Sequence, residues 1–470
     1  MRYLALALIA LLVVCLALFV RTEAGTHVKR ISYTMYKYEL YDVFRRQSGV
    51  DFEKAWNGAH PDDPISVRYE PISGANYSVK LNAEAVAGTM QDIFIVPDFQ
   101  EYVRRGVLLD LTPYVEKQKA QDYLAEIYPA QIDFHTVNGR LYGLPYNLNT
   151  RVLYYNRTLF DRDEMAYPTA DWTWDDLLEA AKKLTKRDSH GRLIQQGLVA
   201  GDAEFWVLWN GGRYWNEAGT RSRINSPAAR EALQFYHDLE FKYHVCPTPT
   251  ELRDISGDVN FQNNRAAMLV GDRWWTAIFK NLSDVNWAVA PLPKSFAGRR
   301  PAYMSFISLG INSKSRHPEV AFAFLLRLTQ PDQVKFLVDV GDSIPIRHGR
   351  EANAEFLADP TRPPGENEAY LAGMDDPIVY WGHHSHSRHL SVEEQSHIIR
   401  RFNEDFSRPN ADIDALLGRL ERELDQLYAE RTAPPKRPSL LAFMLGVAAV
   451  VGGAAFALGL RARVVRQADG

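Results

Sequence analysis

Strand-like and helix-like segments alternate along the chain between residues 27 and 432. Short apolar runs bounded by turn residues predict strands, and longer runs with apolar residues three or four positions apart predict helices. The first of these segments are strands at 27–36, 64–72 and 91–97, a helix at 77–86 that Gly88 ends, and a helix near 100–106. This alternation predicts an α/β architecture.

Several later helices carry recognisable start signals. Thr173 can cap a helix, and Asp176 follows it at the capping-box spacing of three residues. Three other helices have a proline in the first turn: Pro227, Pro318 and Pro331. Ser226 precedes Pro227 and can cap its helix. A last helix, from about 412 to 428, carries leucines at helical spacing, which indicates a face packed on the core.

One segment of strand length does not have the composition of a core strand. Residues 143–156, GLPYNLNTRVLYYN, place asparagine, threonine and arginine between tyrosines. A strand that is buried on both faces should consist mainly of Val, Ile and Leu. Tyr154 and Tyr155 point to opposite faces of a strand, so one of them packs inward whatever the other does. The polar middle of the segment therefore needs an explanation other than core packing.

Two uninterrupted apolar runs flank the alternating region. Tyr3–Val20 and Leu440–Leu460 each approach the roughly 20 residues that cross a bilayer as a helix. Arginines precede the first run and follow the second, and these are Arg2, Arg461, Arg463 and Arg466. Their positions predict that both termini are cytoplasmic. We expect two terminal transmembrane helices, in contact with membrane lipid, on a large extracytoplasmic domain.

The first apolar run allows more than one interpretation. We predict that residues 1–24 form an uncleaved signal anchor; a cleaved signal peptide is the alternative, although residues 22–24 are a poor cleavage site. A further alternative is a lipoprotein signal, in which Cys15 would be the lipid-modified residue. At the other end we predict a stiff Pro-rich linker at 433–439, a transmembrane helix at 440–460 and a cytoplasmic tail at 461–470.

Composition narrows the range of partners. The chain is 46% hydrophobic and 24% charged with a net charge of -4, so it offers no general electrostatic attraction for nucleic acid, and we predict no nucleic-acid partner. One of the two cysteines lies in the first apolar run, so no disulfide framework is expected. Several of the ten tryptophans stand among polar residues, where a ring either anchors the edge of a core or stacks on a ligand.

Known catalytic and cofactor motifs are absent from the sequence. It has no G-x-S-x-G elbow, no glycine-rich phosphate loop and no H-E-x-x-H. No residue pattern indicates a catalytic group or a cofactor, and we predict that the protein is not an enzyme. Four histidines could converge on a metal: His383, His384, His386 and His389. Their spacing fits no standard zinc site, so we predict a polar loop near a cleft rather than a metal site.

Five short motifs, taken in their order along the chain, identify a family resemblance. They lie at 87–115 (AGTMQDIFIVPDFQEYVRRGVLLDLTPYV), 138–160 (NGRLYGLPYNLNTRVLYYNRTLF), 172–184 (WTWDDLLEAAKKL), 261–275 (FQNNRAAMLVGDRWW) and 286–328 (beginning NWAVAPLP). From about residue 28 to about 430, the chain resembles the extracellular solute-binding proteins of carbohydrate ABC importers, the family that includes maltodextrin-binding protein. Asn264 stands where the fourth motif usually has glycine.

The resemblance implies a fold and an arrangement of the chain. The fold would be the two-lobed periplasmic-binding-protein fold, type II-like, with the ligand held between α/β lobes that several hinge crossings join. The first lobe would comprise 27–145 with about 300–345, and the second would comprise 146–298 with about 346–432. Residues 143–156 would be hinge and cleft wall, which accounts for their polar middle.

The resemblance also implies which residues contact the ligand. Trp274 matches the stacking tryptophan that follows the A-A-M run of the fourth motif, and Asn149 stands at an acidic position of the family. The full set of candidates is Tyr36, Lys37, Tyr38, Asp98, Phe99, Gln100, Asn149, Arg151, Phe205, Trp206, Trp274 and His384. Aromatic rings suit the apolar faces of a pyranose, and amide, carboxylate and guanidinium groups suit its hydroxyls.

These implications lead to one main functional hypothesis and several alternatives. The main hypothesis is a membrane-tethered receptor that captures a sugar or oligosaccharide and delivers it to the permease subunits of an ABC transporter. One alternative is a receptor of the same fold for a polyamine, an oxyanion or a metal. The others are an enzyme that acts on polysaccharide and a sensory ectodomain without a transporter.

Overall fold

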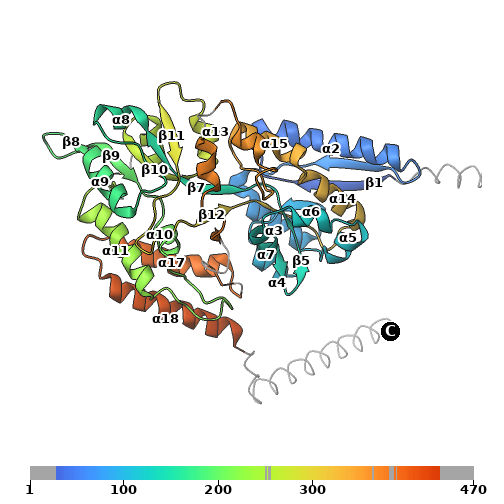
Figure 1. Cartoon of the computed structure of the whole chain (residues 1–470). Coiled ribbons are helices and arrows are strands. Elements are labelled where there is room, and N and C mark those ends of the chain that lie inside the picture. Colours follow the sequence, from blue (N-terminus) through green and yellow to red (C-terminus); the bar gives the residue numbers. More distant parts are fainter. Residues whose placement is uncertain are drawn as a thin grey trace, which may run out of the picture. The chain divides into compact units, whose positions relative to one another are not determined.

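A computed structural model describes residues 28–248, 251, 256–361, 365–380, 386–387 and 389–433 (Figure 1). The described residues up to Asp425 form one compact unit that contains two large β-sheets and one two-stranded sheet. No helix within the described ranges is long and apolar enough to cross a membrane. The predicted transmembrane segments at 3–20 and 440–460, and nearly all of the predicted linker, lie outside those ranges.

The first lobe is built on a five-stranded sheet. Its strands, in sheet order, are β2 (Ile65–Tyr69), β1 (Lys29–Thr34), β3 (Ile93–Ile95), β13 (Ser308–Ile311) and β6 (Leu144–Pro145). β1 is parallel to both of its neighbours, and β13 is antiparallel to both of its own. Central positions such as Ile31, Phe94 and Leu309 are fully buried, as expected for strands that are covered on both faces.

Helices cover this first sheet and complete its core. They are α2 (Glu39–Ala59), α3 (Tyr77–Ala87), α4 (Phe99–Arg104), α5 (Thr112–Lys117), α6 (Gln121–Ala125), α7 (Pro129–His135), α14 (Pro318–Leu328) and α15 (Pro331–Val340). Two short elements lie beside them, the 3-10 turn η1 (Gly74–Asn76) and the hairpin of β4 (Thr136–Val137) and β5 (Arg140–Leu141). Gly88 ends α3 with φ +71°, which confirms the predicted stop.

The second lobe is built on a seven-stranded sheet. Its strands, in sheet order, are β14 (Pro377–Val379), β12 (Ala302–Ser305), β7 (Asn149–Asn156), β10 (Ala266–Asp272), β9 (Leu193–Val199) and β8 (Lys186–Arg187), with β11 (Trp287–Ala290) also paired to β7. The long strand β7 therefore pairs antiparallel with β10, β11 and β12. Tyr154 and Tyr155 are both buried within it.

Helices complete the second lobe, and those that start at Trp174, Pro227 and Ile413 begin where the sequence predicts. The helices are α8 (Arg157–Arg162), α9 (Trp174–Leu184), α10 (Ala203–Trp209), α11 (Pro227–Phe241), α12 (Gly257–Gln262), α13 (Trp275–Phe279), α16 (Ala354–Leu357), η2 (Glu366–Leu371), α17 (Val392–Phe406) and α18 (Ile413–Thr432). Thr173 and Asp176 form the predicted capping box of α9, and Ser226 caps α11 through a hydrogen bond from the Ala229 N–H.

The chain passes between the sheets at three places. Residues 146–148 connect β6 of the first sheet to β7 of the second, which confirms the predicted crossing (Figure 1). Residues 306–307 return from β12 to β13. The segment after α15 meets the first crossing, because Ile344 pairs with Leu148.

The return crossing lies later in the chain than the sequence places it. The prediction assigns residues from about 300 onward to the first lobe, but β12 pairs with β7 in the second sheet. Residues 302–311 form a nearly continuous run of strand-like residues, which gives no compositional break at the point where the chain changes sheets.

Candidate functional site

A cavity of about 560 Å³ lies where the three crossings meet. Its wall takes residues from both lobes and from the crossings themselves. The first lobe contributes Tyr36, Tyr38, Tyr41 and Arg45; the crossings contribute Tyr146, Asn147, Phe306 and Asp342; the second lobe contributes Asn149, Trp274 and Ile278. The cavity therefore lies between the lobes, and a ligand inside it would contact both.

Aromatic rings form the most accessible part of this wall. Trp274 is 36% exposed, and its ring lies 4.0 Å from that of Trp275, measured between centroids. Trp275 is itself stacked on Phe279, so the protein supports one face of the Trp274 ring. The other face of the Trp274 ring lines the cavity. Tyr38 is 55% exposed on the side of the first lobe. Such rings provide flat apolar faces for a ligand.

Two asparagines on the first crossing supply amide groups. The Oδ1 of Asn147 accepts a hydrogen bond of 2.7 Å from the Ile307 N–H, which fixes its side chain against the return crossing. Asn149 is 5% exposed, and its Oδ1 has no hydrogen-bond partner among the described residues. A buried acceptor without a partner costs about 1–3 kcal/mol. A ligand donor in the cavity would remove that cost.

The floor of the cavity contains a buried arginine and a buried carboxyl group. The Arg45 Nη1 donates to the Tyr36 carbonyl at 2.6 Å, and its guanidinium lies over the rings of Tyr41 and Tyr146. Burial raises the pKa of Asp342 to about 7, although Arg45, Tyr41 and Arg273 act in the opposite direction. Asp342 is therefore a titrating group within the cavity wall.

A second hollow, of about 430 Å³, adjoins the first. The two share Val96, Pro97, Phe306, Ser308 and Tyr380, so they are neighbouring hollows of one cleft that meet at these residues. Asp98, Phe99 and Gln100, all predicted as site residues, line the second hollow together with Asp133 and Phe134. The cleft is therefore longer than the first cavity alone.

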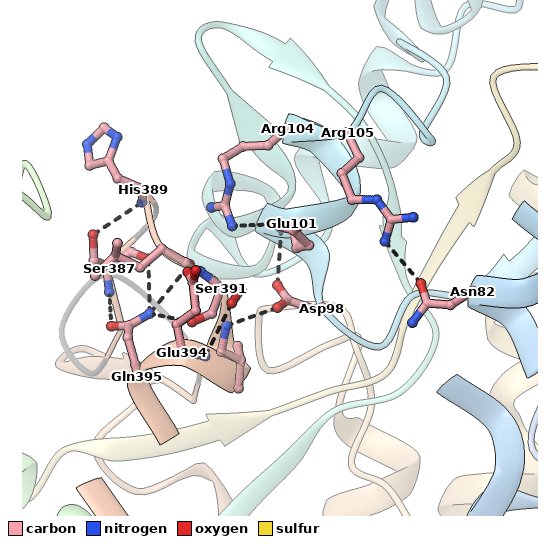
Figure 2. Close-up of polar contacts among 12 residues, drawn as sticks. Asn82, Asp98, Glu101, Arg104, Arg105, Ser387, His389, Ser391, Glu394 and Gln395 are labelled. Carbon is pink, nitrogen blue, oxygen red and sulfur yellow. Dashed lines mark hydrogen bonds and ion pairs between the residues drawn. The ribbon is translucent and has the colours of Figure 1, made fainter. Parts of the chain in front are cut away.

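Asp98 links two helices across this second hollow (Figure 2). Its Oδ1 accepts from the Glu101 N–H at 3.1 Å and caps α4, while its Oδ2 accepts from the Val392 N–H at 3.1 Å at the start of α17. α17 packs on the second lobe, where Phe406 lies against Tyr236 of α11. Burial raises the pKa of the Asp98 carboxyl above its ordinary value, and the two N–H groups oppose that shift.

The start of α17 is itself well ordered by side-chain hydrogen bonds. Ser391 and Glu394 form a capping box, and the Oε1 of Gln395 accepts from the Ser387 N–H at 2.9 Å (Figure 2). Asp98 therefore meets a helix end at which the Ser391 and Glu394 N–H groups already have side-chain partners. We conclude that Asp98 has a structural partner on each lobe.

The structure places other predicted site residues away from the cleft lining. Phe205 and Trp206 are fully buried, and their rings pack on Trp209 and Trp174, respectively, in the core of the second lobe. Lys37 is exposed and lines neither hollow. His384 lies outside the described residues.

Arg151 is held by its own partners rather than presented to the cleft. It forms a double hydrogen bond with Asp272, at 3.0 and 3.2 Å, and a third with Asp202 at 2.9 Å. Its guanidinium lies between the rings of Phe205 and Tyr303, 4.6 Å from each centroid. These contacts occupy the guanidinium and stabilise the end of β7 within the second lobe.

The histidine cluster is only partly described. His386 is buried at the second hollow, and burial lowers its pKa to about 4; the Nε2 of His389 lies 3.0 Å from the Ala218 carbonyl oxygen. Within the described ranges, no group of three or more His, Cys, Asp or Glu side chains is placed to hold a metal ion.

Sequence reasoning missed Tyr41, Asp342 and Tyr380, which the structure brings to the cleft. Asp342 follows Gly341 at the end of a helix, beside a crossing, and that position is the only local signal for it. Tyr41 and Tyr380 carry no signal in the sequence, because their place depends on how distant segments pack.

Comparison with known proteins places this cleft in context. A binding protein of Brucella abortus (strain 2308) is 25% identical over 308 residues, which are 63% of this chain and 73% of that protein. The structure is similar to the ABC substrate-binding protein of Listeria monocytogenes in complex with cycloalternan, with TM-score 0.68, 26% identity and coverage of 85% of this chain and 98% of that one. It is also similar to the sugar-binding protein MalE of Xanthomonas citri, with TM-score 0.69, 21% identity and coverage of 86% and 98%.

The sequence profile of one family matches more than half of the chain. The profile is that of the bacterial extracellular solute-binding proteins, and the match covers residues 50–335. The structural neighbours share the two-lobed α/β fold described above. The chain belongs to the bacterial extracellular solute-binding protein family.

Proposed function

We propose that the protein is an extracytoplasmic receptor that captures a sugar or oligosaccharide between its lobes and delivers it to the permease of an ABC importer. One observation carries this proposal: the exposed ring of Trp274 and the side chain of Asn149, whose buried amide oxygen has no hydrogen-bond partner among the described residues, line the same cavity between the lobes. Family membership and relatives that bind cycloalternan or other sugars support it.

The chemistry of the cavity suits a carbohydrate. A pyranose has apolar C–H faces and a belt of hydroxyl groups. Trp274 and Tyr38 offer ring faces, whereas Asn149 and Asp342 offer acceptors for hydroxyl donors. The neighbouring second hollow leaves room for a ligand of more than one ring.

Ligand capture would act through closure of the lobes. A ligand that contacts Tyr38 of one lobe and Trp274 of the other binds the closed form better than the open form. It therefore shifts the population toward the closed form by as much as the two affinities differ. The hydrogen bond between Asp98 and the Val392 N–H joins the lobes in the same arrangement and supports it.

The proposal includes a membrane tether and a transporter partner. The apolar runs at 3–20 and 440–460 support anchoring at both ends of the chain. Anchoring would keep the receptor near its permease and raise its effective concentration there. Extraction of cell membranes at alkaline pH tests this part: the protein should stay with the lipid, and its release into the soluble fraction would contradict the tether.

A binding experiment tests the proposed ligand class. The full chain, extracted in a detergent without a sugar headgroup, is titrated with maltotriose, mannotriose and arabino-oligosaccharides while tryptophan fluorescence and melting temperature are measured. We expect one of these sugars to raise the melting temperature and change the fluorescence. Polyamines, oxyanions and divalent metals serve as the comparison classes, and stabilisation by one of them alone would contradict the proposal.

Replacement of Trp274 locates the binding site. Trp274→Ala should weaken sugar binding by about 2 kcal/mol, roughly thirtyfold, because it removes a stacking face. Tyr167→Ala is the matched control, since Tyr167 is 39% exposed but lines neither hollow. Equal losses in the two variants would contradict a site at Trp274.

A further inference from the structure

Asp342 stands at a fixed point of the hinge. It follows α15 through Gly341, whose φ of +90° and close approach to Thr276 leave no room for a side chain. The Asp342 N–H donates to the Leu337 carbonyl at 2.8 Å. On its other side, the Oγ of Ser343 accepts from the Leu148 N–H at 3.0 Å. The backbone therefore holds the Asp342 carboxyl at the cavity wall.

Buried groups from both lobes surround this carboxyl. Arg45 and Tyr41 come from α2 of the first lobe, Tyr146 from the first crossing, and Arg273 from the turn between β10 and α13 of the second lobe. Arg45 and Arg273 are only 3% and 2% exposed. Tyr41 forms a hydrogen bond with the carboxyl. The two guanidinium groups attract the ionised form, whereas burial opposes it.

Within the part of the chain that the structure describes, the rest of the lining contains no accessible Lys or Arg. Among the described lining residues of both hollows, Arg45 is the only Lys or Arg, and its side chain is almost completely covered. Three carboxyl groups line the same cleft: Asp342, Asp98 and Asp133. An anionic ligand would lose its hydration here and face carboxylates without gaining a partner of opposite charge.

We infer that Asp342 is a specificity-determining residue, whose carboxylate accepts hydrogen bonds from ligand hydroxyls and restricts the cleft to uncharged saccharides. This inference rests on the proposed function, since it names the class of sugar and one residue that selects it. Hydrogen bonds to an ionised carboxylate are about twice as strong as those between neutral groups. Uronic acids and phosphorylated sugars are excluded because they bring a second negative charge to this position.

Ligand binding should then depend on pH. Hydroxyl donors stabilise the ionised carboxylate, so binding is coupled to the loss of a proton from Asp342 wherever the empty cleft holds it protonated. Burial raises the pKa of the empty-cleft carboxyl to about 7, so the affinity is full above that pH and falls below it. We expect binding about tenfold weaker at pH 5.5 than at pH 8.

Calorimetric titration of the full chain tests the inference. The probes are maltotriose, mannotriose and arabino-oligosaccharides as neutral sugars and trigalacturonate as the anionic one, each at pH 5.5 and pH 8. The variants are Asp342→Asn, Asp342→Glu and, as control, Asp339→Asn, which removes an exposed carboxyl from the preceding helix. Melting temperature without ligand shows that each variant is folded.

The expected results separate this inference from the proposed function. Asp342→Asn should weaken the binding of the neutral sugar at pH 8 by about tenfold or more, and it should remove the pH dependence of that binding. Asp342→Glu should recover part of the affinity and the pH dependence, and Asp339→Asn should match the unaltered protein. Tight binding of trigalacturonate by the unaltered protein, or an unchanged pH profile in Asp342→Asn, would overturn the inference while sugar binding stands. Binding of no saccharide at all would overturn both.

Discussion

Two carboxyl groups in the cleft, Asp98 and Asp342, share an environment but differ in their partners. Burial raises the pKa of both above the ordinary aspartate value. Asp98 accepts hydrogen bonds from two backbone N–H groups, one from each lobe. Asp342 lines the first cavity beside Tyr41, with the buried Arg45 and Arg273 near its carboxyl but, among the described residues, no backbone N–H donor bonded to it. A carboxylate with backbone partners on both lobes can hold the lobes together, whereas one that faces open space can recognise a ligand.

The same contrast extends to the two hollows. In the first, Asn149 keeps a buried oxygen without a partner, and Trp274 keeps an exposed ring face. In the second, Asp98 is satisfied by protein N–H groups. Unsatisfied polar groups in a cleft destabilise the empty protein and are compensated by a ligand. We therefore propose that the first hollow carries recognition, and that the second combines lobe closure with extra room for the ligand.

The largest expected effect comes from Asn149. Asn149→Leu keeps the approximate shape of the side chain but removes its amide, so ligand binding should weaken by about 2 kcal/mol, roughly thirtyfold. The empty protein should lose no stability, because the Oδ1 has no protein partner to lose. Titration calorimetry measures the affinity, and thermal unfolding measures the stability. A large fall in melting temperature with normal affinity would reverse the roles given to the two hollows.

Replacement of Asp98 should have a smaller and less selective effect. Asp98→Asn can still cap α4 but replaces one acceptor with a donor, so it loses the hydrogen bond from Val392. We expect the binding of every sugar to weaken by the same amount, about 1 kcal/mol. The reason is that the variant lowers the population of the closed form and removes no single ligand contact. Binding constants for several sugars test this. Glu101→Gln is the control, and a change limited to one sugar would make Asp98 a recognition residue.

Much of the fold could be predicted because its signals are local. The capping box at Thr173 and the glycine stop at Gly88 depend on residues within one turn of each other, and the structure confirms both. The crossing segment 143–156 was implied by the family resemblance rather than by a local signal, and residues 146–148 within it connect the two sheets. The helix α2 was missed, because its apolar Leu40, Val43 and Val50 are exposed while Arg45 is buried, which inverts the expected pattern.

The site was less predictable than the fold. Trp274 and Asn149 reach the cavity as the family resemblance implies, whereas Phe205 and Trp206 pack in the core. An aromatic ring among polar residues fits both outcomes, and α10 is buried at every position from Phe205 to Trp209, so its sequence marks no side that faces the cleft. Asp342 could not be found from sequence, because its surroundings come from three segments far apart in the chain.

The second hollow should make the binding affinity depend on the length of the sugar. If a sugar chain extends past Phe306 and Tyr380, a trisaccharide should bind more tightly than its monosaccharide, and Asp133 should contribute to that difference. Asp133 is exposed at this hollow, so Asp133→Ala should leave the fold intact. The variant should weaken the binding of the trisaccharide by about 0.5–1 kcal/mol. The monosaccharide should bind both proteins equally. An equal loss for the two sugars would place Asp133 beside the first ring instead.

The smallest expected effect concerns the stability of the empty protein. Because the pKa of Asp342 is higher in the folded protein than in the unfolded chain, the folded form binds more protons between about pH 4 and pH 7. The free energy of unfolding therefore falls as the pH rises through that range. It falls because the carboxyl group of Asp342 becomes charged while it is largely removed from water. Asp342→Asn removes this group, so its melting temperature at pH 8 should exceed that of the unaltered protein by about 2 °C, with little difference at pH 4. A lower melting temperature at pH 8 would mean that the carboxylate stabilises the hinge through Arg45 and Arg273, which would make it a structural group like Asp98.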